Sequence, residues 1–71
     1  MIDARQLVGP GPIDRTSRAF APLPRGSVAE VLTTDPETIP GFRAWTRAAG
    51  HTLLSETATN GGVYRFLIQH G

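Results

Sequence analysis

The sequence contains no cysteine and no lysine, only five aromatic residues, and no long apolar run. Without cysteine, the chain has no disulfide, no thiolate metal ligand, no redox thiol and no thiol that could form a persulfide. Its uninterrupted apolar stretches are only a few residues long, far short of the ~20 residues that a membrane-spanning helix needs. The opening Met-Ile-Asp-Ala-Arg lacks the basic start and apolar run of a secretory signal. We therefore expect a cytoplasmic protein without a membrane partner.

The charges of the chain nearly balance, and its length limits it to a small core. The chain has seven arginines and six acidic residues, which gives a formal net charge of +1. Affinity for nucleic acid scales with the number of cations presented to phosphates, so this balance argues against direct nucleic-acid binding. A chain of 71 residues buries only about 60% of its unfolded surface on folding. We therefore expect residues 1–71 to form one domain, and we expect a monomer.

Apolar periodicity and the placement of proline and glycine divide the chain into six elements. Short apolar runs with β-branched residues predict strands, and apolar residues three and four apart predict helices. Pro12 suits the first turn of the first helix, Pro22 ends that helix, and Gly50 closes the second. The hairpin between the last two strands is predicted from Asn60-Gly61. The expected strands are 2–7, 27–33, 53–57 and 63–69, and the expected helices are 12–21 and 38–49.

The order βαβαββ predicts an α/β fold built as a two-layer sandwich. Each strand-helix-strand unit implies a parallel crossover, and the final hairpin adds antiparallel strands, so the four-stranded sheet is mixed. Two helices for four strands most economically cover one face of the sheet. In the last strand, the more aromatic alternating set is Tyr64, Phe66 and Ile68, which we place toward the helices.

Several motifs along the chain resemble the TusA-like (SirA-like) family of sulfur carriers. The family signature Leu-Asp-x-x-Gly-x-x-Cys-Pro-x-Pro, followed at once by a helix, aligns with Ile-Asp-Ala-Arg-Gln-Leu-Val-Gly-Pro-Gly-Pro at residues 2–12. The family's Asp-Pro entry to the second helix matches Asp35-Pro36. Ala44, Trp45, Gly50, His51 and Leu53 fit its second helix and exit, and residues 62–68 look like its last strand. The resemblance covers nearly the whole chain and implies the same βαβαββ fold.

The sequence departs from the family pattern where the family's chemistry lies. The sulfur-carrying cysteine of the family falls on Gly9, and a second, commonly seen cysteine falls on Thr46. A third departure places Gln6 at the family's glycine. A carrier cysteine just before a helix N-terminus gains thiolate character from the helix dipole. Glycine offers only its amide, so either the family member has lost sulfur carriage or the chain was altered at position 9.

Candidate binding residues surround Gly9. The segment Gly9-Pro10-Gly11-Pro12 precedes a helix and could dock an anion or thiol substrate, but its two prolines donate no N–H and Asp14 adds negative charge. We favour the interpretation of a rigid turn kept from an ancestral site. In the family this edge faces sulfur donors and acceptors, so the resemblance implies a protein-docking patch, against the alternative of a solvated helix face. The candidate residues are Arg5, Gly9, Pro10, Gly11, Pro12, Arg15 and Arg18.

The remaining polar and aromatic residues fit structural roles. His51 and His70 are the only histidines, and without further ligands they predict no metal site. His51 is expected to cap or pack, and Phe42, Trp45 and Ala49 to form the core stripe of the second helix rather than a surface that stacks bases. Arg43 and Arg47 have no motif behind them and are interpreted as a solvated helix face. No catalytic constellation or cofactor motif is present, and we expect no cofactor.

Three functions remain open from the sequence. The resemblance implies a sulfur-relay protein, which receives sulfane sulfur from a cysteine desulfurase or rhodanese and passes it to an acceptor for tRNA thiolation, cofactor synthesis or sulfur oxidation. A second function is a cysteine-free family member that docks to relay partners without carrying sulfur. A third is a small nucleic-acid or scaffold module. We favour the second, which leaves this chain without the family's sulfur-transfer activity.

Overall fold

The computed structural model describes residues 1–71 and places four strands and two helices in the predicted order. Every observed boundary lies within three residues of the predicted one. The elements are β1 (Ile2–Ala4), α1 (Gly11–Phe20), β2 (Val28–Thr33), α2 (Thr38–Ala49), β3 (Thr52–Ala58) and β4 (Tyr64–Gln69).

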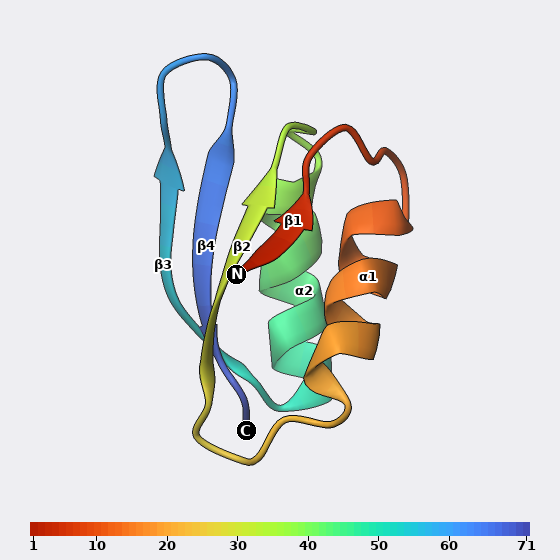
Figure 1. Cartoon of the computed structure of the whole chain (residues 1–71), viewed down its shortest axis with the longest axis vertical. Helices are drawn as coiled ribbons and strands as arrows, with labels where there is room; N and C mark the ends of the chain where they lie inside the picture. Colours follow the sequence, from red (N-terminus) through yellow and green to blue (C-terminus); the bar gives the residue numbers. More distant parts are fainter.

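The four strands form one mixed sheet, and both helices cover the same face of it (Figure 1). The strand order is β1-β2-β4-β3, with β1 parallel to β2 and with antiparallel pairing of β4 to β2 and to β3. The predicted two-layer βαβαββ sandwich is confirmed. The parallel β1–β2 pair follows from the α1 crossover, whereas β3 and β4 are joined by a hairpin that projects beyond the helices in Figure 1.

The core lies between the sheet and the two helices. Six apolar residues are buried there: Ala4, Phe20, Val31, Phe42, Phe66 and Ile68. Phe66 and Ile68 of β4 point toward the helices as predicted, and half-buried Tyr64 packs against the same cluster. Phe42 meets Phe66 with ring centroids 4.8 Å apart, which joins α2 to the middle of the sheet.

The buried stripe of each helix differs from the one predicted by apolar residues alone. On α1 the buried residues are Pro12, Thr16 and Phe20, while Ser17 and Ala21 are exposed; on α2 they are Thr38, Phe42 and Thr46, while Ala49 is exposed. Threonine is tolerated at these positions because its hydroxyl can bond to a backbone carbonyl one turn back. Thr16 donates to the Pro12 carbonyl and Thr46 to the Phe42 carbonyl, both at 2.8 Å, so only the methyl groups need apolar partners.

One predicted boundary and one predicted turn residue were wrong, and backbone conformation explains both. The first strand ends at Ala4 rather than residue 7, because Gln6 adopts a left-handed conformation with φ of 69° that ends extended pairing. In the β3–β4 hairpin the positive φ angles belong to Gly61 and Gly62 rather than to Asn60, so a glycine pair makes the turn.

Candidate functional site

The segment between β1 and α1 is a tight loop held at both ends. The Gln6 N–H donates to Thr34 Oγ1 at 2.8 Å, which ties the loop to the end of β2. The Gly11 N–H donates to the Val8 carbonyl at 3.2 Å, which closes the turn that enters α1. Gly9 lies at the tip of this turn with φ of 61°.

The departure from the family pattern at Gln6 affects the backbone conformation. It is the only non-glycine residue with a positive φ, and it stands where the family has glycine. A left-handed conformation costs a residue with a Cβ roughly 1–2 kcal/mol, whereas glycine adopts it freely. The departure therefore adds local backbone strain at this position.

We expect Gln6→Gly to stabilise the protein by up to about 1 kcal/mol, because relief of strain outweighs the greater freedom of glycine in the unfolded chain. Urea denaturation measures the free energy of unfolding. Gln69→Gly, at an extended position in β4, is the matched control and is expected to destabilise. A loss of stability in Gln6→Gly equal to that of the control would contradict the strain argument.

Gly9 and the start of α1 offer little to an anion. Pro10 and Pro12 have no N–H, the Gly11 N–H is already donated, and the Asp14 N–H bonds the Pro10 carbonyl at 2.9 Å. The Asp14 carboxylate also adds negative charge to the first turn. A Cβ added at Gly9 would meet no atom within 4 Å, so the position opens to solvent. The loop can present a side chain outward, but it supplies few free amides to a phosphate.

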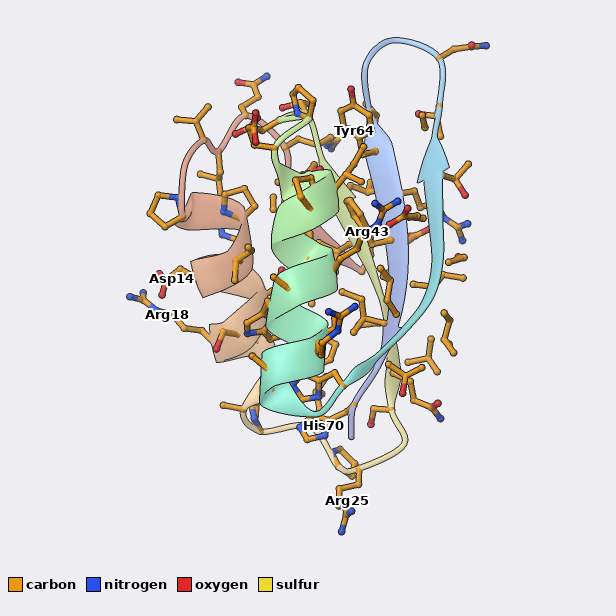
Figure 2. The ribbon with its side chains drawn as sticks, turned by 180° about the vertical axis from the view of Figure 1, so that it is seen from behind. Asp14, Arg18, Arg25, Arg43, Tyr64 and His70 are labelled. Atoms are coloured by element: carbon orange, nitrogen blue, oxygen red, sulfur yellow. The ribbon has the colours of Figure 1, made fainter.

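The three arginines near the loop are all engaged with this chain. Arg5 makes a two-point ion pair with Asp3, and hydrogen bonds from Arg5 lower the pKa of the Asp3 carboxyl to about 2. Arg15 donates to the Asp3 carbonyl oxygen at 3.1 Å, which joins α1 to β1. Arg18 pairs with Asp14 at 3.2 Å on the outer face of α1 (Figure 2). Three arginines and two aspartates leave one net positive charge there.

Sequence reasoning missed an exposed apolar residue at the tip of the loop. The side chain of Val8 is 74% exposed, between the Asp3–Arg5 pair and the start of α1. The sequence did offer a signal for Val8, because it lies one residue before the family's cysteine position. We use the term loop patch for the surface formed by Arg5, Val8, Gly9, Pro10, Gly11, Pro12, Arg15 and Arg18.

The two family cysteine positions lie in different environments. Gly9 is exposed at the loop tip, whereas Thr46 is 4% exposed on the core-facing side of α2. The Thr46 hydroxyl bonds the carbonyls of Phe42 and Arg43. Position 46 is therefore a packing position in this chain, and only position 9 is open to solvent.

The two histidines, treated separately in the sequence, meet at the other end of the molecule. Their ring centroids are 4.7 Å apart, and His51 also packs against Trp45 at 4.9 Å and Phe20 at 5.0 Å. The Gly71 N–H donates to His51 Nδ1 at 3.0 Å, which requires that nitrogen to be unprotonated. The pairing of Thr52 with Gln69 places the two histidines side by side, a register that the sequence did not define.

Burial lowers the pKa of His51 below its ordinary value of 6.5, and the nearby His70 lowers it further. The unfolded chain therefore binds a proton more readily than the folded one, and stability falls as pH drops below about 6.5. We expect urea denaturation to show this loss between pH 7.5 and roughly pH 5, above the range in which Asp3 takes up a proton. His51→Gln is expected to flatten the dependence, and an unchanged slope would contradict the assignment.

Arg43 was interpreted as part of a solvated helix face; its side chain is indeed 58% exposed, but it is not isolated. It makes a two-point ion pair with Glu56 of β3, and the hydrogen bond to Glu56 raises the pKa of Arg43. Arg47, one turn further along α2, is exposed and makes no ion pair, as expected. The ion pair links α2 to the hairpin, a contact between segments that periodicity alone does not bring together.

No group of three or more histidine, aspartate or glutamate side chains converges in a metal-binding arrangement. Neither helix is long and apolar enough to span a bilayer. The candidate site is therefore the loop before α1, on a two-layer βαβαββ scaffold.

Comparison with known proteins identifies this scaffold. The family model described as Sulfurtransferase TusA matches residues 1–70. The putative sulfur carrier protein YrkI of Bacillus subtilis is 38% identical over 71 residues, covering the whole chain and 93% of YrkI. The sulfur carrier protein TusA of Allochromatium vinosum is 34% identical over 68 residues, covering 96% of the chain and 88% of that protein.

A solved structure matches the fold over almost its full length. The crystal structure of the SirA-like protein from Desulfitobacterium hafniense superposes with a TM-score of 0.86 at 27% identity, covering 99% of this chain and 95% of that one. The chain therefore belongs to the TusA sulfurtransferase family. The resemblance inferred from the motifs is confirmed, and within that family this chain lacks any thiol.

Proposed function

We propose that this chain docks to the proteins of a sulfur relay without carrying persulfide sulfur. The single observation that carries the proposal is the glycine at the exposed loop tip, on a scaffold that otherwise keeps the family fold. A persulfide needs a thiol, and the chain has none. A protein that retains the docking surface and lacks the thiol occupies a partner without accepting its sulfur.

The partners that this proposal implies are a sulfur donor, namely a cysteine desulfurase or rhodanese, and a sulfur acceptor. The loop patch supports such docking because it combines an exposed apolar anchor, Val8, with flanking charges, the arrangement that protein interfaces use. We further propose that the chain works as a monomer in the cytoplasm, that it competes with cysteine-bearing carriers, and that the relay it regulates leads to tRNA thiolation.

The alternative, a sulfur carrier whose cysteine was substituted at position 9, is favoured by one observation. A Cβ at Gly9 would point into open space, so a cysteine there would have room for a persulfide and for a partner's thiol. The positive φ of Gly9 opposes this alternative, because it is a conformation that residues with a Cβ adopt at a cost.

A competition experiment tests docking. Excess chain is expected to slow sulfur transfer from a cysteine desulfurase to a cysteine-bearing TusA carrier. Val8→Ser removes the apolar anchor, and Arg18→Glu reverses a charge that is 81% exposed. Each is expected to weaken competition about tenfold, the charge reversal mainly through association rate at low salt.

The chain supplies a matched control for each variant. Val28→Ser changes a valine that is 54% exposed on β2, and Arg47→Glu reverses an unpaired arginine on α2. Arg43 is unsuitable as a control because its ion pair joins α2 to the hairpin. If Arg47→Glu weakens competition as much as Arg18→Glu, net charge explains the effect and the loop patch is wrong. If the unmodified chain does not compete, the proposed docking function is wrong.

A further inference from the structure

A cleft lies between the beginning of α2 and the β3–β4 hairpin, away from the loop patch. Its volume is about 240 Å³, and we call it the hairpin cleft. The hairpin beside it projects past the helices (Figure 1). Figure 2 shows Arg43 reaching from α2 toward the hairpin, with Tyr64 farther along the same side. The residues used below are Ile39, Arg43, Glu56, Ala58, Tyr64 and Phe66.

The floor of the hairpin cleft is apolar. Ile39, Ala58 and the ring of Tyr64 form its accessible apolar surface, and the fully buried Phe66 packs beneath them. A closed apolar cavity of about 150 Å³ is large enough to hold benzene. The hairpin cleft therefore has room for an apolar side chain together with a small polar group.

The polar wall of the cleft is the Arg43–Glu56 ion pair, which carries no net charge but is not saturated. Arg43 gives its Nε and one Nη2 hydrogen to the Glu56 carboxylate. A guanidinium has five N–H donors and a carboxylate about four acceptor positions. Three donors of Arg43 and two acceptor positions of Glu56 thus remain, side by side at the edge of the cleft.

This pair selects against ligands with a single charge. An anion attracted to Arg43 is repelled by Glu56, and a cation attracted to Glu56 is repelled by Arg43. A ligand with an anionic and a cationic group a few ångströms apart meets both partners favourably, and it can keep its apolar part on Ile39 and the ring of Tyr64. Among small molecules, an α-amino acid with an apolar side chain has this arrangement.

We propose that the hairpin cleft binds a free α-amino acid with an apolar side chain, its carboxylate on Arg43, its ammonium on Glu56 and its side chain on Ile39 and the ring of Tyr64. The cleft shares no residue with the loop patch. Binding there therefore stands or falls independently of the docking function.

Titration of the ¹⁵N-labelled full chain with L-leucine, followed by amide chemical shifts, tests the proposal. Saturable shifts with a millimolar dissociation constant are expected, confined to residues of the hairpin cleft. N-acetyl-leucine lacks the ammonium, leucinamide lacks the carboxylate, and glycine lacks the side chain. Each is expected to bind at least about tenfold more weakly, because each loses a charge-assisted hydrogen bond or the apolar contact.

Variants of the ion pair give a second, independent measurement. Arg43→Gln and Glu56→Gln are each expected to weaken leucine binding about tenfold, whereas Arg47→Gln on the same helix leaves it unchanged. The comparison among ligands uses the unmodified chain, so it holds even if a variant is poorly folded. Equal binding of leucine and N-acetyl-leucine, shifts outside the cleft, or no saturable shift would each overturn the proposal.

Discussion

A cysteine desulfurase supplied with cysteine is expected to leave the mass of this chain unchanged, whereas the Gly9→Cys variant is expected to gain about 32 Da, one sulfur atom. In the variant the new thiolate attacks the terminal sulfur of the enzyme's persulfide, and the enzyme's own cysteine leaves as a thiolate. The native chain has no thiol to make this attack, and neither hydroxyl nor imidazole holds sulfane sulfur stably. Intact-protein mass spectrometry measures both outcomes.

The second family position supplies the matched control. Thr46 is 4% exposed and bonded to two carbonyls, so Thr46→Cys places a thiol in the core, where a desulfurase cannot reach it. No mass gain is expected from that variant. A stable gain on the native chain would contradict the argument from missing thiols. Loading of Thr46→Cys but not of Gly9→Cys would show that the loop tip does not face the donor.

Phe66→Ala is expected to cost about 3–5 kcal/mol of unfolding free energy, because it removes a fully buried ring and leaves a cavity. The total stability of a domain with 71 residues is of the order of 4–10 kcal/mol. The variant therefore loses a large share of its stability. Urea denaturation measures the change, and circular dichroism reports whether folded protein remains at room temperature.

Leu54→Ala is the control for this substitution. Leu54 is 49% exposed on β3, and exposed positions usually change stability by no more than ~0.5 kcal/mol. A similar cost for both variants would mean that the ring of Phe66 is not the centre of the core. A cost for Phe66→Ala below about 1 kcal/mol would mean the same.

The sequence predicted the fold well because its signals were local. Pro12, Pro22 and Gly50 mark helix ends through backbone chemistry that needs no tertiary contact, and the alternation along β4 assigned Phe66 and Ile68 to the core. The family motifs placed Gly9 at the loop before α1, where the structure has it. These features depend on residues close together in the chain.

The features that were missed depend on tertiary contacts. The meeting of His51 with His70 requires the register of β3 against β4, which a bulge between Leu53 and Ser55 shifts. The meeting of Arg43 with Glu56 requires the packing of α2 on β3. The buried threonines were missed for a different reason. A pattern of apolar residues leaves out threonines whose hydroxyls bond to backbone carbonyls of the same helix. The left-handed conformation of Gln6 could be seen only in the backbone angles of the structure, because glutamine does not usually adopt it and so does not predict it.

The brevity of β1 has a consequence for motion. Its three residues pair only with Val31, Leu32 and Thr33, so the strand that leads into the loop before α1 has the shortest ladder of the sheet. Segments with few backbone hydrogen bonds open at lower free energy than the global unfolding transition. We expect β1 and the loop to detach together as one cooperative unit while β2, β4 and β3 stay paired. A partner that binds the loop would therefore also slow the detachment of β1 from the edge of the sheet.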